Sequence, residues 1–237
     1  MFHASLKLSE QKHYSQNGED GVLVKLAATI GRLHRGYYVE FGASNGAECN
    51  TRYLREKHAW RGLLMDGYRG HAPNPRLNLH IEQITHDNIV RLLAKHEVPR
   101  ELDVLSVDTD FADYWILESI LISGKYAPKI VVHEANGKRA CVSVAKPARG
   151  EIRHWDGASE YSGASVCAYQ CLAQRFGYTM VYCESKGVNC FWLRDDMIGT
   201  KAGMDVALVK SVLTEQFLYP FGLTEHSNQY KWTELSC

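Results

Sequence analysis

Short apolar runs alternate with amphipathic stretches along most of the chain, and this alternation constrains the fold more than any other feature. Five apolar runs predict strands, at residues 37–43, 62–67, 79–84, 103–110 and 129–136. Helical spacing between them predicts helices, at residues 47–58, 87–96 and 114–122. This order is typical of right-handed βαβ units, and nearly continuous apolar strands suit burial on both faces. We therefore predict an α/β protein whose mostly parallel sheet carries helices on both faces.

The regular alternation of predicted strands and helices ends after residue 136. Residues 137–162 show no periodic pattern but contain basic and aromatic side chains, and a segment this long outside regular structure is usually functional or disordered. We expect a lid over the ligand site there, with a solvated insertion as the alternative. A helix at 165–176 and a hairpin of strands 178–183 and 188–193 would follow, and residues 197–237 would form a C-terminal extension with a helix at 203–213.

Charge and cysteine content limit the partners and the compartment. Lys and Arg number 27, as do Asp and Glu, so no overall field attracts nucleic acid or an anionic membrane. A net charge near zero leaves room for a homodimer. Seven cysteines without CxxC spacing predict free thiols in the cytoplasm. Cys183 and Cys190 would face each other across a hairpin with a two-residue turn, as a widely spaced pair that stays reduced.

The segment VEFGASNG (39–46) is the most informative in the chain. A strand ends in the acidic Glu40, and Gly42 and Gly46 then lead into a helix, which places a ligand at the carboxyl end of the strand. The GxxxG spacing differs from the dinucleotide fingerprint GxGxxG, so a pyrophosphate is disfavoured. Asp66 ends the next strand, where an acid can accept hydrogen bonds from ribose hydroxyls. Without a phosphate, such a ribose suits S-adenosylmethionine; a purely structural turn is the alternative.

Six motifs, in this order and spacing, give the chain a family resemblance: YSQNGEDGVL (14–23), VEFGASNGAECN (39–50), GLLMDG (62–67), LDVLSVDTDFADYW (102–115), KIVVHEAN (129–136) and SKGVNCFWLRDD (185–196). The chain resembles FkbM-type methyltransferases, a class I S-adenosylmethionine-dependent group, over residues 14–196. The resemblance implies a single domain (1–237), a seven-strand Rossmann-like sheet with an antiparallel last strand, and O-methylation. It also implies that the cofactor residues are Glu40, Gly42, Asn45, Gly46 and Asp66. Thr85 would lie near the adenine if the third strand ends there.

Acidic residues gather where the fourth and fifth strands end. Asp108 and Asp110 share one face, as do Glu134 and Asn136, because side chains alternate along a strand. Asp108, Glu134 and Asn136 would offer the oxygen ligands that Mg²⁺ or Mn²⁺ prefers.

Without a metal, crowding of these carboxylates would raise a pKa and provide a general base. Asp108, Asp110 and His133 are the candidates for that base, and Asp108 also adjoins the cofactor. The alternative is a purely structural role, in which Asp110 caps the next helix.

The resulting prediction is a methyltransferase that acts on the hydroxyl of a small molecule or sugar. The alternative is a catalytically degenerate binding protein on the same fold. Phe111 motivates that alternative, because related sequences usually have glycine at this position.

Overall fold

The computed structural model describes residues 2–137, 143–145, 163–198 and 232–234 of the chain. Seven strands form one sheet in the order β3-β2-β1-β4-β5-β8-β7. Their bounds are β1 (Tyr37–Phe41), β2 (Arg61–Asp66), β3 (Leu79–Ile81), β4 (Val104–Val107), β5 (Ile130–Glu134), β7 (Tyr178–Cys183) and β8 (Asn189–Arg194). The first five are parallel, and β8 runs antiparallel between β5 and β7.

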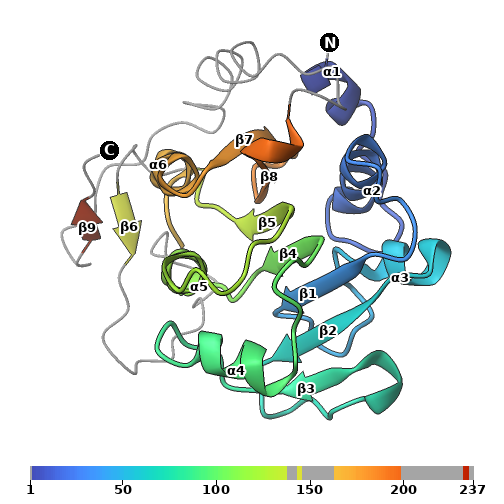
Figure 1. Ribbon diagram of the computed structural model, residues 1–237, viewed down its shortest axis with the longest axis vertical. Coiled ribbons are helices and arrows are strands. Elements are labelled where there is room, and N and C mark those ends of the chain that lie inside the picture. Colours follow the sequence, from blue (N-terminus) through green and yellow to red (C-terminus); the bar gives the residue numbers. More distant parts are fainter. Residues whose placement is uncertain (1, 138–142, 146–162, 199–231, 235–237) are drawn as a thin grey trace.

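Helices cover both faces of this sheet. The helices are α1 (Phe2–Lys7), α2 (Glu19–Thr29), α3 (Arg52–His58), α4 (Ile89–Lys95), α5 (Asp113–Ile122) and α6 (Val166–Arg175). In Figure 1, α2 and α3 lie on one side of the strands, and α4, α5 and α6 lie on the other. A separate two-stranded sheet pairs β6 (Ser143–Ala145) with β9 (Trp232–Glu234) in antiparallel fashion. The predicted fold class, a mostly parallel Rossmann-like sheet with an antiparallel hairpin strand, is confirmed.

Burial of apolar strands between the helix layers holds the sheet together. All four residues of β4 are buried, and Ile130, Val131 and Val132 of β5 are fully inaccessible to solvent. Each valine, leucine or isoleucine among them contributes about 1.5–3 kcal/mol by leaving water. The predicted helix at 47–58 begins only at Arg52. The reason is local, because the Glu40 carboxylate accepts the backbone amides of Asn50 and Thr51 and fixes the turn before the helix.

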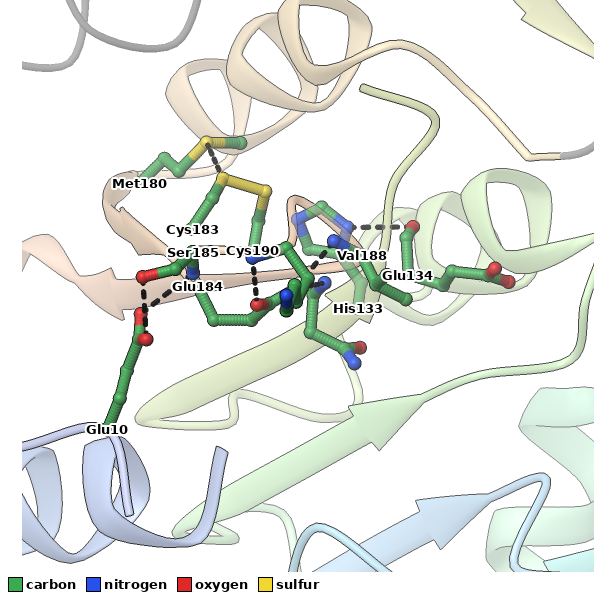
Figure 2. The surroundings of a disulfide bond; sticks show 11 residues. Glu10, His133, Glu134, Met180, Cys183, Glu184, Ser185, Val188 and Cys190 are labelled. Carbon is green, nitrogen blue, oxygen red and sulfur yellow. Dashed lines mark hydrogen bonds between the residues drawn. A yellow bond between two sulfur atoms is a disulfide. The ribbon is translucent and has the colours of Figure 1, made fainter. Parts of the chain in front are cut away.

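The hairpin corrects the expectation of reduced cysteines. A disulfide joins Cys183 and Cys190, whose Cα atoms lie 3.9 Å apart (Figure 2). The amide of Glu184 donates to the Asn189 carbonyl (3.0 Å), so the loop spans four residues, 185–188, rather than two. That register makes the cysteines the closely spaced, non-hydrogen-bonded pair.

Two further cysteines contradict the free-thiol expectation. Cys167 and Cys171, both in α6, are disulfide-bonded as well. Cys49 is a free, buried thiol. Disulfides are rare in a reducing cytosol, so the cysteines no longer support a cytoplasmic location.

Some predicted segments lie outside the described residues. They are most of the lid at 137–162, the helix at 203–213 and most of the C-terminal extension at 197–237. Among the helices that the structure does describe, none has the length and apolar character needed to cross a bilayer.

Candidate functional site

A cavity of about 690 Å³ opens at the carboxyl edge of the sheet. Its lining comes from the residues that follow β1, β2, β3 and β4, together with the start of β8 and the loop before α2. This is the edge at which open α/β sheets bind their ligands. The volume lies within the range of small-molecule sites, roughly 300–1,000 Å³.

The turn after β1 forms the floor of the cavity. Gly42 has a φ of +71° and Gly46 a φ of +82°, both in the left-handed region that favours glycine. A Cβ on Gly42 would lie 1.7 Å from the backbone oxygen of Asp108, so β1 and β4 approach this closely only because residue 42 lacks a side chain. The amide of Gly46 closes the turn by donating to the Ala43 carbonyl (2.7 Å).

Glu40 lines the cavity, but groups of the chain itself occupy most of its hydrogen-bonding positions. Its Oε1 accepts the Asn50 amide (2.7 Å), and its Oε2 accepts both the amide and the hydroxyl of Thr51. Burial raises the pKa of the Glu40 carboxyl, and these hydrogen bonds oppose the rise. A carboxylate offers about four lone-pair positions, so one position on Oε1 remains for a ligand.

Asp66 is held as firmly as Glu40 at the cavity, by three hydrogen-bond contacts. Its Oδ2 accepts the Ser44 amide (2.7 Å), while its Oδ1 accepts the Tyr68 amide (2.8 Å) and lies 3.1 Å from Nδ1 of His71. The residue is 6% exposed. These contacts hold the carboxylate at the wall of the cavity, across the β1 turn from β4.

The predicted cofactor residues are brought together with one exception. The cavity lining includes Glu40, Gly42, Asn45, Asp66, Thr85 and Asp108. Gly46 instead packs behind the turn, where an added Cβ would meet the Leu77 side chain at 2.7 Å.

Three carboxylates converge at the end of β4 and β5. Asp108, Asp110 and Glu134 each place one oxygen within 4.8 Å of the others. Burial raises the pKa of Asp108 well above its ordinary value, and the charges of Asp113 and Asp110 raise it further. Burial likewise raises the pKa of Glu134, with Asp108 as the next cause. One oxygen of Glu134 is buried without a hydrogen-bond partner.

Asp110 and Asp113 both lie between β4 and the first turn of α5, but they have different roles. Asp110 is exposed, has a φ of +66° and lines the cavity. Asp113 is fully buried at the start of α5, and its Oδ1 accepts the amide (2.6 Å) and hydroxyl (3.1 Å) of Thr109. Burial raises the pKa of Asp113 to about 6. Thus Asp113 organises the turn after β4 and leaves Asp110 to face the cavity.

His133 is not brought to the cavity. Its side chain is fully buried, its ring stacks on Tyr169 at 3.8 Å, and its Nδ1 lies 3.1 Å from the backbone oxygen of Glu134 (Figure 2). Burial lowers the pKa of His133 to about 3. The alternation of side chains along β5 explains this placement, since Glu134 turns toward the acidic cluster and His133 toward the core.

Asn136 and Phe111 have distinct places near the cluster. The amide of Asn136 donates to the Ala164 carbonyl (2.8 Å), which ties the chain after β5 to the start of α6. Phe111 is 2% exposed and is not part of the cavity lining. Phe111, which motivated the prediction of a degenerate site, therefore packs into the protein and does not line the cavity.

Several lining residues escaped the sequence analysis. Ser44, Tyr68 and His71 surround Asp66. Ser44 lies within the GxxxG segment, but its contact with Asp66 was not predicted, and Tyr68 and His71 come from a loop without periodicity or a recognised spacing. Asn189 lines the opposite wall and donates to Glu19 (2.8 Å). Asn189 lies beside the hairpin turn, within the motif SKGVNCFWLRDD (185–196), but the sequence assigned no role to it.

The hairpin turn also holds the N-terminal segment against the cavity. Glu10 accepts from the hydroxyl of Tyr182 and from both the amide (2.8 Å) and hydroxyl (2.6 Å) of Ser185 (Figure 2). Glu184 shapes the turn from within by accepting the amides of Lys186 and Val188. The loop before α2 follows Glu10 in the chain, and its Ser15 and Gln16 line the cavity; Asp20 holds Ser15 by accepting its amide and hydroxyl (both 2.8 Å).

Comparisons with known proteins complete the description. No family model matches the sequence, and no curated protein matches it. Solved structures that resemble the chain include a putative O-methyltransferase from Klebsiella pneumoniae, which is 13% identical with a TM-score of 0.43; the match covers 80% of this chain and 87% of that one. Human methyltransferase-like protein 13 in complex with SAH is 11% identical with a TM-score of 0.43, over 87% of this chain and 94% of that one.

The CurJ carbon methyltransferase is 12% identical with a TM-score of 0.46, over 80% of this chain. The match covers 57% of that structure, so this chain spans little more than half its length. The order of the seven strands and the antiparallel placement of β8 define the chain as a Rossmann-like α/β protein.

Proposed function

We propose that the chain is an S-adenosylmethionine-dependent methyltransferase of the FkbM type, which methylates a hydroxyl oxygen of a small molecule or sugar. One observation carries the proposal. A single cavity joins the Gly42–Gly46 turn and the buried acid Asp66 to the carboxylates at the end of β4. The first two features suit an adenosine without phosphates, and the third suits removal of a proton.

The residues present fit this cofactor. Asp66 is placed to accept ribose hydroxyls, and Thr85 lies at the cavity wall beyond β3, where the adenine would lie. The free lone-pair position of Glu40 and the carboxylate of Asp108 can face the cationic groups of the methionine part. When bound, the cofactor supplies an electrophilic methyl group on a sulfonium.

Asp108 is the residue that we assign as the general base. It would accept the hydroxyl proton of the acceptor when that oxygen takes the methyl group, and the rest of the cofactor would leave as S-adenosylhomocysteine. The products are a methyl ether, S-adenosylhomocysteine and the proton on Asp108. Because the pKa of Asp108 is raised above that of an ordinary aspartate, its carboxylate binds a proton more strongly and is a better general base. The cavity must hold the acceptor oxygen about 3 Å from the methyl group.

The cofactor assignment is tested by pairing a protein variant with a ligand variant. Asp66→Ala should weaken S-adenosylhomocysteine binding by roughly 1–3 kcal/mol, the cost of losing a buried hydrogen-bonding partner. Calorimetry would measure both proteins with S-adenosylhomocysteine and with its 2′,3′-dideoxy analogue. The wild type should lose affinity for the analogue, whereas Asp66→Ala should bind both ligands alike.

The ligand control matters because Asp66 also holds the amides of Ser44 and Tyr68. An Asp66→Ala protein that still prefers the natural ribose would contradict the assignment. If the wild type binds S-adenosylhomocysteine but transfers no methyl group to any acceptor in a broad screen, the degenerate binding protein becomes the better description.

As the alternative to a free general base, we propose that the acidic edge binds a divalent metal, Mg²⁺ or Mn²⁺, through Asp108 and Glu134, with Asn136 from the same edge and Asp110 as an added ligand. Two ligands of one such ion, each at about 2.1 Å, lie at most about 4.2 Å apart. The oxygens of Asp108, Asp110 and Glu134 all lie within 4.8 Å of one another, so side-chain shifts of less than about 1 Å would bring them within that limit. A cation would relieve the repulsion that raises the pKa of Asp108 and Glu134.

Metal removal should abolish most methyl transfer if this proposal is right. A chelator should stop turnover, and added Mn²⁺ should restore it. Asp110→Asn should weaken Mn²⁺ binding at least about tenfold, as losses around metal ligands generally do. Asp196→Asn, which removes an exposed carboxylate paired with Arg194, is the matched control and should bind Mn²⁺ as the wild type does. Full turnover in excess chelator, with equal Mn²⁺ affinity in both variants, would reject the metal.

A further inference from the structure

The Asp66 carboxylate has too few free positions for the ligand that it is placed to bind. Oδ1 already serves two donors, the Tyr68 amide (2.8 Å) and the His71 ring (3.1 Å). Oδ2 serves the Ser44 amide (2.7 Å). Of about four lone-pair positions on a carboxylate, one remains. A ribose that presents both hydroxyls to Asp66 needs two.

The three present donors differ in how easily they can leave. The amides of Ser44 and Tyr68 belong to the backbone on either side of the carboxylate, and Ser44 has a φ of +51° that fixes its turn. His71 is a side chain, 29% exposed, at the end of a loop that lines the cavity. Its ring can rotate away, whereas the amides cannot move without remodelling the turns.

The ring of His71 spans the ribose end of the cavity. Its Nδ1 lies 3.1 Å from Asp66, and its Nε2 lies 3.4 Å from the Ser44 hydroxyl. The edge of the ring meets Tyr68, with ring centroids 4.9 Å apart. His71 thus bridges the turn after β1 and the loop after β2, which are the two segments between which the ribose would lie.

We propose that His71 is a specificity residue that competes with the ribose for Asp66. The ring holds one Asp66 oxygen in the free protein and leaves it when a ligand brings a vicinal diol. Ligands without that diol cannot displace the ring in exchange for hydrogen bonds of equal number. His71 therefore lowers the affinity for adenosine ligands that bring the diol to Asp66, and it leaves unchanged the affinity for deoxy ligands, which do not use that oxygen. This inference rests on the proposed function, since it concerns the same cofactor site.

Substituting His71 should change affinity in the direction opposite to Asp66→Ala. His71→Ala frees the Asp66 oxygen and should bind S-adenosylhomocysteine about fivefold more tightly, the scale of one net hydrogen bond. Its affinity for the 2′,3′-dideoxy analogue should not rise, because that ligand does not use the freed oxygen. His71→Gln keeps a side-chain donor within reach and should return the affinity toward that of the wild type.

A matched control comes from a second histidine–carboxylate contact outside the cavity lining. Nε2 of His96 lies 2.8 Å from Glu82, so His96→Ala removes a contact of the same kind and should leave both affinities unchanged. Calorimetry on the full chain would measure all four proteins with both ligands. A folded His71→Ala protein with unchanged or weaker S-adenosylhomocysteine binding would overturn the competition. Failure of the wild type itself to bind that ligand would reject the cofactor site, and the competition with it.

Discussion

Replacing Asp108 with asparagine should reduce methyl transfer by about 10²–10⁴-fold, the range that a positioned general base contributes. The amide has nearly the same shape as the carboxylate but cannot take the acceptor proton at neutral pH. Because the change is isosteric, S-adenosylhomocysteine affinity should fall far less than turnover. The measurement is the rate of S-adenosylhomocysteine formation with an acceptor found by screening sugars, phenols, lipids and peptides against methyl-labelled cofactor.

The general-base role of Asp108 also fixes the direction in which turnover changes with pH. A base acts in its deprotonated form, so turnover by the wild type should rise with pH as Asp108 loses its proton. Burial and the charges of Asp113 and Asp110 raise the pKa of Asp108, which places that rise at higher pH than for an ordinary aspartate. The rise should be absent in Asp108→Asn.

Asp113→Asn is the matched control for these effects. Asp113 is buried outside the cavity lining, and its charge is one cause of the raised Asp108 pKa. Asparagine can still accept from Thr109, so the turn after β4 should persist. Turnover at high pH should be retained, while the rise moves to lower pH. A profile of Asp108→Asn that matches the wild type within a factor of three would exclude Asp108 as the base.

The sheet was predictable because its signals are local. Each apolar run that becomes β1, β2, β4 or β5 is nearly continuous, and the glycines after β1 mark the turn. Since parallel strands end at one edge of a sheet, the sequence also predicted that Asp66 and Asp108 lie at a common site, and both line the cavity. The alternation of side chains along β5 separated Glu134 from His133, although the sequence still kept His133 as a candidate base.

The features that could not be predicted depend on loop geometry. The bridge between Cys183 and Cys190 follows from a loop of four residues instead of two, and Glu184 decides that length by accepting amides within the turn. His71 reaches Asp66 only because the loop after β2 folds back, and no spacing rule reports this. In each case one side-chain acceptor, Glu184 or Asp66, stabilises one loop conformation among several of similar propensity.

A single methyl group on Gly42 should disrupt both the fold and the site. The new Cβ would lie 1.7 Å from the Asp108 backbone oxygen and 2.9 Å from its carbonyl carbon, so β1 and β4 would have to separate. Strain from the left-handed φ of +71° adds to this overlap. Together they should lower the free energy of unfolding by roughly 2–5 kcal/mol. Any folded fraction should bind S-adenosylhomocysteine poorly, because the floor of the cavity and Asp108 move together.

Gly31 provides a control with the same backbone angle. Its φ is also +71°, but nothing lies within 4 Å of an added Cβ, so Gly31→Ala isolates the conformational strain, about 1–2 kcal/mol. Gly46→Ala should fall between the two, because its Cβ meets the end of the flexible Leu77 side chain instead of backbone. Denaturant unfolding of the three variants should thus give losses in the order Gly42, Gly46, Gly31. Equal losses at Gly42 and Gly31 would mean that β1 and β4 can move apart at little cost, and the close contact beneath the cavity would then not be what positions Asp108.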